Sequence, residues 1–166
     1  MRTSVYAAIP LMTVLAVLET AVLPRFPILG LVPQLPFLVA LSWGLLRDFE
    51  EGITWAFVGG LILDLFSIGP TGLTALAWMI AIALALLIAQ SFPTSRVILP
   101  ALDAGFATLV YLALYFLLLR LFGYQTSLEI TTALPPLAIL HALLILPIYW
   151  FMYTVDKKFW PRRVQI

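Results

Sequence analysis

The sequence predicts an all-α integral membrane protein: a bundle of six transmembrane helices with both termini in the cytoplasm. Hydrophobic residues make up 63% of the 166-residue chain, charged residues make up 10%, and the mean hydropathy is +1.10. Soluble domains are about 45–50% apolar and about 25% charged. The apolar residues also gather in runs long enough to cross a bilayer, and the cations are divided unequally between the loops.

Six apolar stretches account for the predicted helices. Crossing the hydrocarbon core takes about 20 apolar residues, with a range of roughly 17–25. The stretches that meet or approach this length are 5–23, 28–46, 52–66, 73–92, 101–122 and 135–155. We expect them to form a single bundle over residues 1–166.

Helix-ending residues separate these stretches. The first follows Arg2 and resembles a signal peptide, but it lacks a clear small-x-small cleavage site, so we interpret it as an uncleaved helix. The breaks that follow it are Pro24 and Pro27, Arg47–Glu51, Pro70 and Gly72, Pro93 and Pro100, and Gly123. Pro135 and Pro136 suit the first turn of the sixth helix, where missing N–H groups cost little.

The third and fourth helices carry small residues at a four-residue spacing. In the third, Gly52, Ala56 and Gly60 lead to Asp64. The fourth carries Ala77, Ala81, Ala85 and Ala89. Small residues let membrane helices approach closely, so we expect a tightly packed antiparallel hairpin. The alternative is that alanine and glycine are simply common in membrane helices.

Lysine and arginine, which accumulate in cytoplasmic loops, give the orientation. A six-helix topology places Arg2, Arg47, Arg96, Lys157, Lys158, Arg162 and Arg163 on one side. Only Arg25 and Arg120 lie on the other. We therefore predict that both termini are cytoplasmic.

Four polar residues lie toward the outer ends of their predicted helices: Glu19, Gln34, Asp64 and Arg120. Charges inside a membrane are usually tolerated by pairing, so we expect a buried polar layer in which Arg120 faces Glu19 or Asp64. The favoured interpretation is structural, either a clamp between helices or an Arg120 side chain that reaches out to the membrane interface, with a ligand or proton site as the alternative. Asp48–Glu51, at the predicted cytoplasmic surface, are expected to be solvated.

Enzyme motifs are missing. The chain has no nucleotide-binding loop, no HExxH, no GxSxG, one histidine (His141) and no cysteine. We expect no enzymatic activity, no cofactor and no metal site. The net charge of +1 gives no indication of nucleic-acid binding. A bundle of this kind is expected to act through partners or by enclosing a ligand.

Residues 31–78 carry an ordered set of short motifs. These are Val32-Pro33-Gln34-Leu35, Leu45-Leu46-Arg47, Gly52, Phe57-Val58-Gly59-Gly60-Leu61, Asp64-Leu65, Gly69-Pro70-Thr71-Gly72-Leu73 and Ala75-Leu76. In order and spacing they resemble the central region of the MreD family of bacterial rod shape-determining proteins. Many relatives have an acidic residue where this chain has Gln34.

The resemblance implies a non-enzymatic, multi-pass protein of the bacterial inner membrane that belongs to the cell-elongation (Rod) machinery. It implies binding to an MreC-type single-span partner, and through it an indirect link to the MreB filament, RodA and a class B penicillin-binding protein. The implied role is scaffolding or regulation of side-wall peptidoglycan synthesis.

The alternative is the substrate-binding subunit of an energy-coupling-factor vitamin transporter, which is also a six-helix bundle of similar size. Such subunits typically carry an Ala-x-x-x-Ala motif in the first helix. Here the alanines of that helix are Ala7, Ala8, Ala16 and Ala21, with no pair at that spacing.

Overall fold

The computed structural model describes residues 3–91, 98–124 and 130–159. In these ranges the regular structure is helical, which confirms the predicted all-α fold. The α-helices are α1 (Thr3–Val17), α2 (Leu35–Leu46), α3 (Phe49–Leu65), α4 (Leu73–Ala89), α5 (Ile98–Leu121) and α6 (Ile130–Phe159). A π-helical turn, Leu18–Val22, and a 3₁₀ turn, Leu23–Arg25, extend α1.

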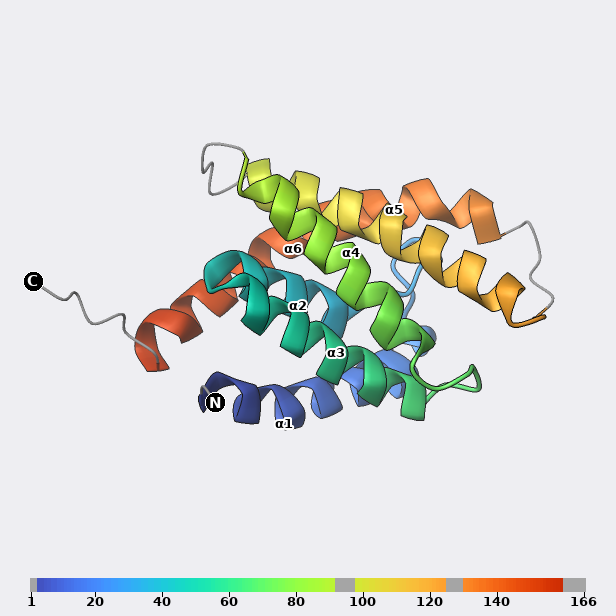
Figure 1. Ribbon diagram of the computed structural model, residues 1–166, viewed down its shortest axis with the longest axis horizontal. Helices are drawn as coiled ribbons and strands as arrows, with labels where there is room; N and C mark the ends of the chain where they lie inside the picture. Colours follow the sequence, from blue (N-terminus) through green and yellow to red (C-terminus); the bar gives the residue numbers. More distant parts are fainter. Residues whose placement is uncertain (1–2, 92–97, 125–129, 160–166) are drawn as a thin grey trace, which may run out of the picture.

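The helices form one bundle with α2 at its centre, in contact with all five other helices (Figure 1). Around it, α1 packs on α3, α3 on α4, α4 on α5 and α5 on α6. The start of α1, the α2–α3 connection and the end of α6 lie at one end of the bundle, which we call the α2–α3 end. The α3–α4 connection and the end of α5 lie at the other, the α3–α4 end.

Among the described residues, three helical segments are long and apolar enough to cross a membrane: Tyr6–Arg25, Ile98–Leu121 and Leu134–Phe159. Two further apolar helices are shorter, Leu35–Leu46 and Leu73–Ala89. The structure therefore supports a membrane protein, and the count of six spans stays a prediction.

The second helix begins seven residues later than predicted. Ile28 and Leu31 exchange two backbone hydrogen bonds of 2.9 Å around the turn residues Leu29 and Gly30, which have φ values of 52° and 79°. A positive φ is incompatible with a right-handed helix. Pro33 restricts the preceding backbone as well, so the apolar run at 28–34 is a tight turn and an extended segment.

The sixth helix is longer than predicted, because it already begins at Ile130. Pro135 and Pro136 consequently lie inside it and not in its first turn. The third helix starts at Phe49, three residues before the predicted start, because Asp48 has the extended backbone that precedes a helix.

The core is built from large aromatic side chains on the central helices. Trp43, Trp55, Trp78 and Phe37 are each at most 2% exposed. Trp43 of α2 stacks on Trp55 of α3 with ring centroids 4.6 Å apart, and Phe37 lies 5.3 Å from the ring of Trp78. Such aromatic pairs contribute about 0.5–1.5 kcal/mol each beyond the area they bury.

Candidate functional site

Asp64 closes the connection between α3 and α4. It is 3% exposed near the end of α3, and its Oδ2 accepts the backbone N–H groups of Gly72 at 2.8 Å, Thr74 at 3.1 Å and Ala75 at 3.4 Å. These are unpaired donors at the start of α4, whose N-cap residue Gly72 has no side chain to accept them. The buried carboxylate therefore caps the next helix.

The turn residues hold this arrangement in place. Gly72 has a φ of 95°, a left-handed conformation that glycine adopts without steric cost. The carbonyl of Pro70 accepts the N–H of Leu73 at 3.4 Å, and the Ser67 hydroxyl donates to the carbonyl of Asp64 at 3.2 Å. The short loop can thus place the start of α4 against the end of α3.

The small residues of α3 face two different neighbours. A Cβ added to Gly60 would lie 2.5 Å from the Cα of Ala75 in α4. At Gly52 it would lie 2.7 Å from the Cα of Gly44 in α2. Ala56 is fully buried between these two contacts, so α3 fits closely between α2 and α4. On α4, Ala77, Ala81 and Ala85 are fully buried, whereas Ala89 is half-buried.

A second polar group joins the start of α2 to α5 and α6. The backbone N–H of Gln34 donates to Nε2 of His141 at 3.0 Å, and the Gln34 side-chain amide donates to the Tyr111 hydroxyl at 2.6 Å. The His141 Nδ1 lies 2.8 Å from the Thr108 hydroxyl, which also donates to the carbonyl of Ala104. Pro33, beside Gln34, is fully buried.

This geometry assigns the tautomer of His141. Nε2 accepts a backbone N–H and so carries no proton, which leaves the proton of the neutral ring on Nδ1. Nδ1 then donates to the Thr108 hydroxyl, whose own hydrogen points to Ala104. Both ring nitrogens of His141 are occupied, so the ring serves as a link between α2, α5 and α6.

Glu19 lies in the π-helical turn after α1 and is 7% exposed. The backbone N–H of Leu35, the first residue of α2, donates to its carboxylate. The carboxylate therefore stands at the start of α2 much as Asp64 stands at the start of α4. Within the described ranges, one backbone N–H is directed to Glu19, whereas three reach Asp64.

The position of Arg120 differs from the prediction, which placed this residue in a buried polar layer with Glu19, Gln34 and Asp64. Its side chain is exposed, and its guanidinium carbon lies 4.6 Å from the ring centroid of Phe116, one helical turn away. Cation–π contact with a neighbouring ring and exposure of the charged group both lower the cost of this cation. Of the four residues predicted for the layer, Glu19 and Asp64 are buried and Gln34 is half-buried.

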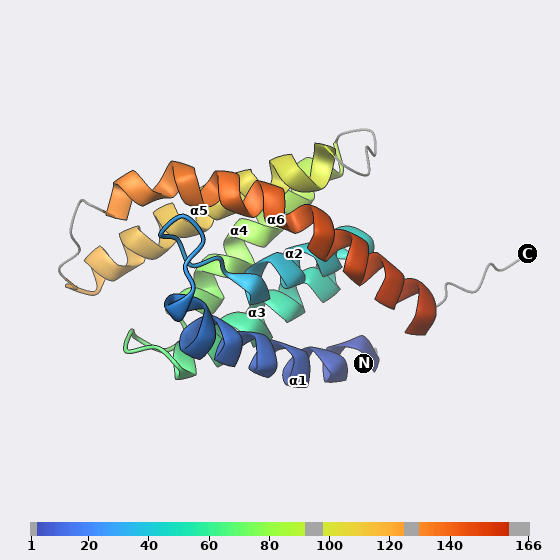
Figure 2. The ribbon, with the colours of Figure 1, turned by 180° about the vertical axis from the view of Figure 1, so that it is seen from behind.

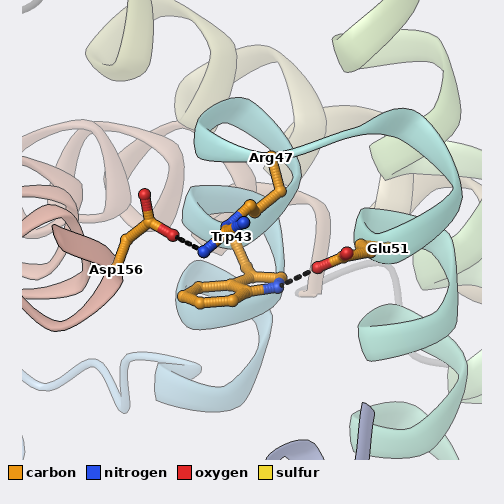
Figure 3. A network of polar contacts seen from close by, with 4 residues as sticks. All are labelled: Trp43, Arg47, Glu51 and Asp156. Carbon is orange, nitrogen blue, oxygen red and sulfur yellow. Dashed lines mark hydrogen bonds and ion pairs between the residues drawn. The ribbon is translucent and has the colours of Figure 1, made fainter. Parts of the chain in front are cut away.

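The α2–α3 end carries a polar network that the sequence did not indicate (Figure 3). The indole N–H of Trp43 donates to Oε2 of Glu51 at 2.9 Å, and Arg47 forms an ion pair with Asp156 of α6. The Arg47 guanidinium also lies 5.5 Å from the Trp43 ring centroid. Glu51, predicted to be solvated, is 5% exposed because it faces this indole.

An apolar groove is lined by residues of α1, α2 and α6. In Figure 2, α1 and α6 lie on either side of α2. It has a volume of about 280 Å³ and an almost wholly apolar lining. Leu35 and Val39 of α2 form its floor. Leu11 and Leu15 of α1 line one wall, and Ile148 and Phe151 of α6 line the other.

These groups do not assemble a recognisable catalytic set. In the described ranges, no three histidine, aspartate or glutamate side chains come together as metal ligands. The buried polar side chains join helices: Asp64 joins α3 to α4, His141 joins α6 to α2 and α5, and Asp156 joins α6 to the α2–α3 connection. The arrangement suits a rigid bundle with an apolar groove for another molecule.

Comparison with known proteins gives one match. The family model described as rod shape-determining protein MreD matches residues 1–159 of the chain. No curated protein and no solved structure matches this chain.

Proposed function

The chain belongs to the MreD family of rod shape-determining proteins, and from this we propose that it acts as a non-enzymatic scaffold or regulator of the cell-elongation complex in the bacterial inner membrane. The family match, which spans residues 1–159, is the observation that carries the proposal. Membership in this family implies a role in rod shape, and the mode of action and the partner are proposed here.

The distribution of polar groups supports a partner-dependent role. Asp64, Glu51 and His141 are each engaged in contacts between helices or within a helix connection. Polar groups engaged in this way stabilise the bundle and are not available to react with a substrate. The function of such a protein then depends on the surface that it presents to a partner.

We place the contact with an MreC-type single-span partner in the groove between α1 and α6. Its two walls lie on the segments Tyr6–Arg25 and Leu134–Phe159, which are long enough to cross the membrane, so a partner helix in the bilayer could reach the groove from the lipid. Association in lipid depends on close packing. A single transmembrane helix seated between the two walls would bury side chains of both, Leu15 and Phe151 among them.

The test is co-purification with the MreC-type protein of the same organism from gently solubilised membranes. Leu15→Trp narrows the groove and should lose most of the co-purified partner. Leu109→Trp makes the same change on α5, where the side chain is 43% exposed and outside the groove, and should retain it. Both variants are also assayed for restoring rod shape in cells depleted of the native protein.

Failure of the wild-type chain to capture that partner and restore rod shape would overturn the proposed function. Equal capture by the two tryptophan variants would move the partner away from the groove. A vitamin-sized molecule bound together with ATPase subunits would instead identify a transporter subunit.

A further inference from the structure

The last turns of α6 project beyond the other helices at the α2–α3 end of the bundle (Figure 1 and Figure 2). Along this part of α6, Trp150, Tyr153 and Lys157 follow one another at spacings of three and four residues, which places them on one helix face. Their contacts confirm the shared face. The rings of Trp150 and Tyr153 meet edge to face with centroids 6.4 Å apart, and the Lys157 Nζ lies 4.7 Å from the Tyr153 ring centroid.

This face of α6 is open to the surroundings of the bundle. Trp150 is 59% exposed, the neighbouring Phe151 is 63% exposed, and Lys157 and Lys158 are both exposed. The Lys158 Nζ also lies over a ring, 5.8 Å from the centroid of Phe159. A lysine with its stem along an aromatic surface is apolar on one side and charged at its tip. Side chains of this kind, together with exposed tryptophan and tyrosine, suit the boundary between hydrocarbon and lipid headgroups.

The positive charge of the two lysines is not balanced by a carboxylate of α6. Asp156, the residue before them, is buried and forms an ion pair with Arg47 at the end of α2. In the described ranges no ion pair joins either lysine to an acidic side chain. The exposed carboxylates of Asp48 and Glu50 lie at the α2–α3 connection, on a different part of the chain. The end of α6 therefore presents two adjacent cations beside an aromatic surface.

The spacing of these residues along α6 matches the depth of the headgroup layer. Lys157 comes seven residues after Trp150. Seven residues correspond to about 10 Å along a helix axis, and the headgroup region on each side of the hydrocarbon is about 5–8 Å thick. When the Trp150 ring lies at the edge of the hydrocarbon, the ammonium groups of the two lysines therefore reach the level of the lipid phosphates.

We propose that Trp150, Tyr153, Lys157 and Lys158 form a binding surface for the headgroup of an anionic phospholipid. The two lysines attract the net negative charge of the headgroup, and the indole N–H of Trp150 can donate to a phosphate or ester oxygen. A zwitterionic headgroup offers the same phosphate but carries a cation of its own, which the lysines repel. The surface consequently favours anionic over zwitterionic lipids, independently of any protein partner.

Native mass spectrometry of the full chain in a mild detergent tests this proposal. Phosphatidylglycerol is the anionic probe, and phosphatidylcholine with the same acyl chains is the zwitterionic one. The wild-type chain should retain one phosphatidylglycerol at concentrations where little phosphatidylcholine stays bound. Higher concentrations of ammonium acetate should lower the amount of bound phosphatidylglycerol, because salt screens exposed charges.

The double variant Lys157→Gln, Lys158→Gln should bind phosphatidylglycerol about 10–30-fold more weakly than the wild type. The matched control is Arg25→Gln with Arg120→Gln, which removes two exposed cations from the α3–α4 end and should keep the binding. Arg120 also lies over an aromatic ring, so the control retains that feature of the comparison. Because the two double variants have the same net charge, a difference between them comes from the end of α6 and not from the overall charge.

Fluorescence quenching gives the position of the lipid. Phosphatidylglycerol with acyl chains brominated near the headgroup quenches tryptophans that it contacts, and Trp43, Trp55 and Trp78 are at most 2% exposed. The quenching of the wild-type chain should fall in Trp150→Phe, which keeps an aromatic ring at that position. Equal retention of the two lipids by the wild type would overturn the proposal. Equal binding by the two double variants, or quenching that Trp150→Phe leaves unchanged, would overturn it as well.

Discussion

Gly60 of α3 and Ala75 of α4 approach so closely that a Cβ on Gly60 would lie 2.5 Å from the Ala75 Cα and 2.7 Å from its nitrogen. Both atoms belong to the backbone, so no side-chain rotation can relieve the contact. We predict that Gly60→Ala lowers stability by about 1–3 kcal/mol, the usual range for overpacking. The measurement is Tm in detergent.

Gly105→Ala is the control for that substitution. A Cβ at Gly105 of α5 would meet its nearest neighbour at 3.8 Å, an ordinary van der Waals distance. Replacing glycine by alanine inside a helix should then be neutral or stabilising by about 0.5–1 kcal/mol. Equal Tm values for the Gly60 and Gly105 variants would contradict the close crossing of α3 and α4.

The carboxylate of Asp64 gives the second prediction. Asp64→Asn keeps one acceptor oxygen for the N–H groups of Gly72 and Thr74 but loses the charge that strengthens both bonds. Hydrogen bonds to charged groups contribute about 1.5–3 kcal/mol each, so we expect a lower Tm for Asp64→Asn and a still lower one for Asp64→Leu. Glu50→Gln, an exposed change on the same helix, should leave Tm unaltered. An Asp64→Leu protein as stable as the wild type would show that the cap is unimportant.

The small, acidic and turn residues at the α3–α4 connection could be recognised from the sequence. The hydrogen-bond partners of the buried polar groups could not. Gly60, Asp64 and Gly72 stand out because small, acidic and turn residues are informative at short range. The acceptor role of Asp64 depends on how the loop folds back, whereas the sequence suggested that Arg120 faces either Asp64 or Glu19. Gln34 and His141 are 107 residues apart, so no spacing rule could join them.

The start of α2 is a second feature that the sequence pattern did not predict correctly. Four of the seven residues at 28–34 are hydrophobic, and an apolar stretch alone does not separate a helix from a turn. The positive φ values of Leu29 and Gly30 make this segment a turn, and a leucine in the sequence does not indicate a positive φ. Glu51 was assigned to solvent for a related reason: its partner, Trp43, lies on another helix.

Cysteine labelling tests the six-helix topology, because the chain has no cysteine of its own. Glu50→Cys lies at the α2–α3 end, and Ile68→Cys replaces a fully exposed residue in the connection at the α3–α4 end. We predict that an impermeant reagent added outside the cytoplasmic membrane labels position 68 and reaches position 50 only after the membrane is permeabilised. Labelling of both positions from one side would exclude the predicted topology.

The ion pair between Arg47 and Asp156 fixes the end of α6 to the α2–α3 connection, and the two side chains are 16% and 12% exposed. Each single variant places two like charges against one another at a site largely removed from water, so we predict that Arg47→Asp and Asp156→Arg each lower Tm. The double variant, which restores opposite charges, should recover part of the loss, with a coupling energy of about 0.5–3 kcal/mol. Limited trypsin digestion gives a second measurement. Lys157 and Lys158 are exposed but lie within α6, and a released α6 end can unwind around them, so both single variants should be cut faster. Lys157→Gln alters a neighbouring charge that lies over the Tyr153 ring and should change Tm little. Strictly additive single effects would mean that the two residues do not interact, and that apolar packing alone holds the end of α6 in place.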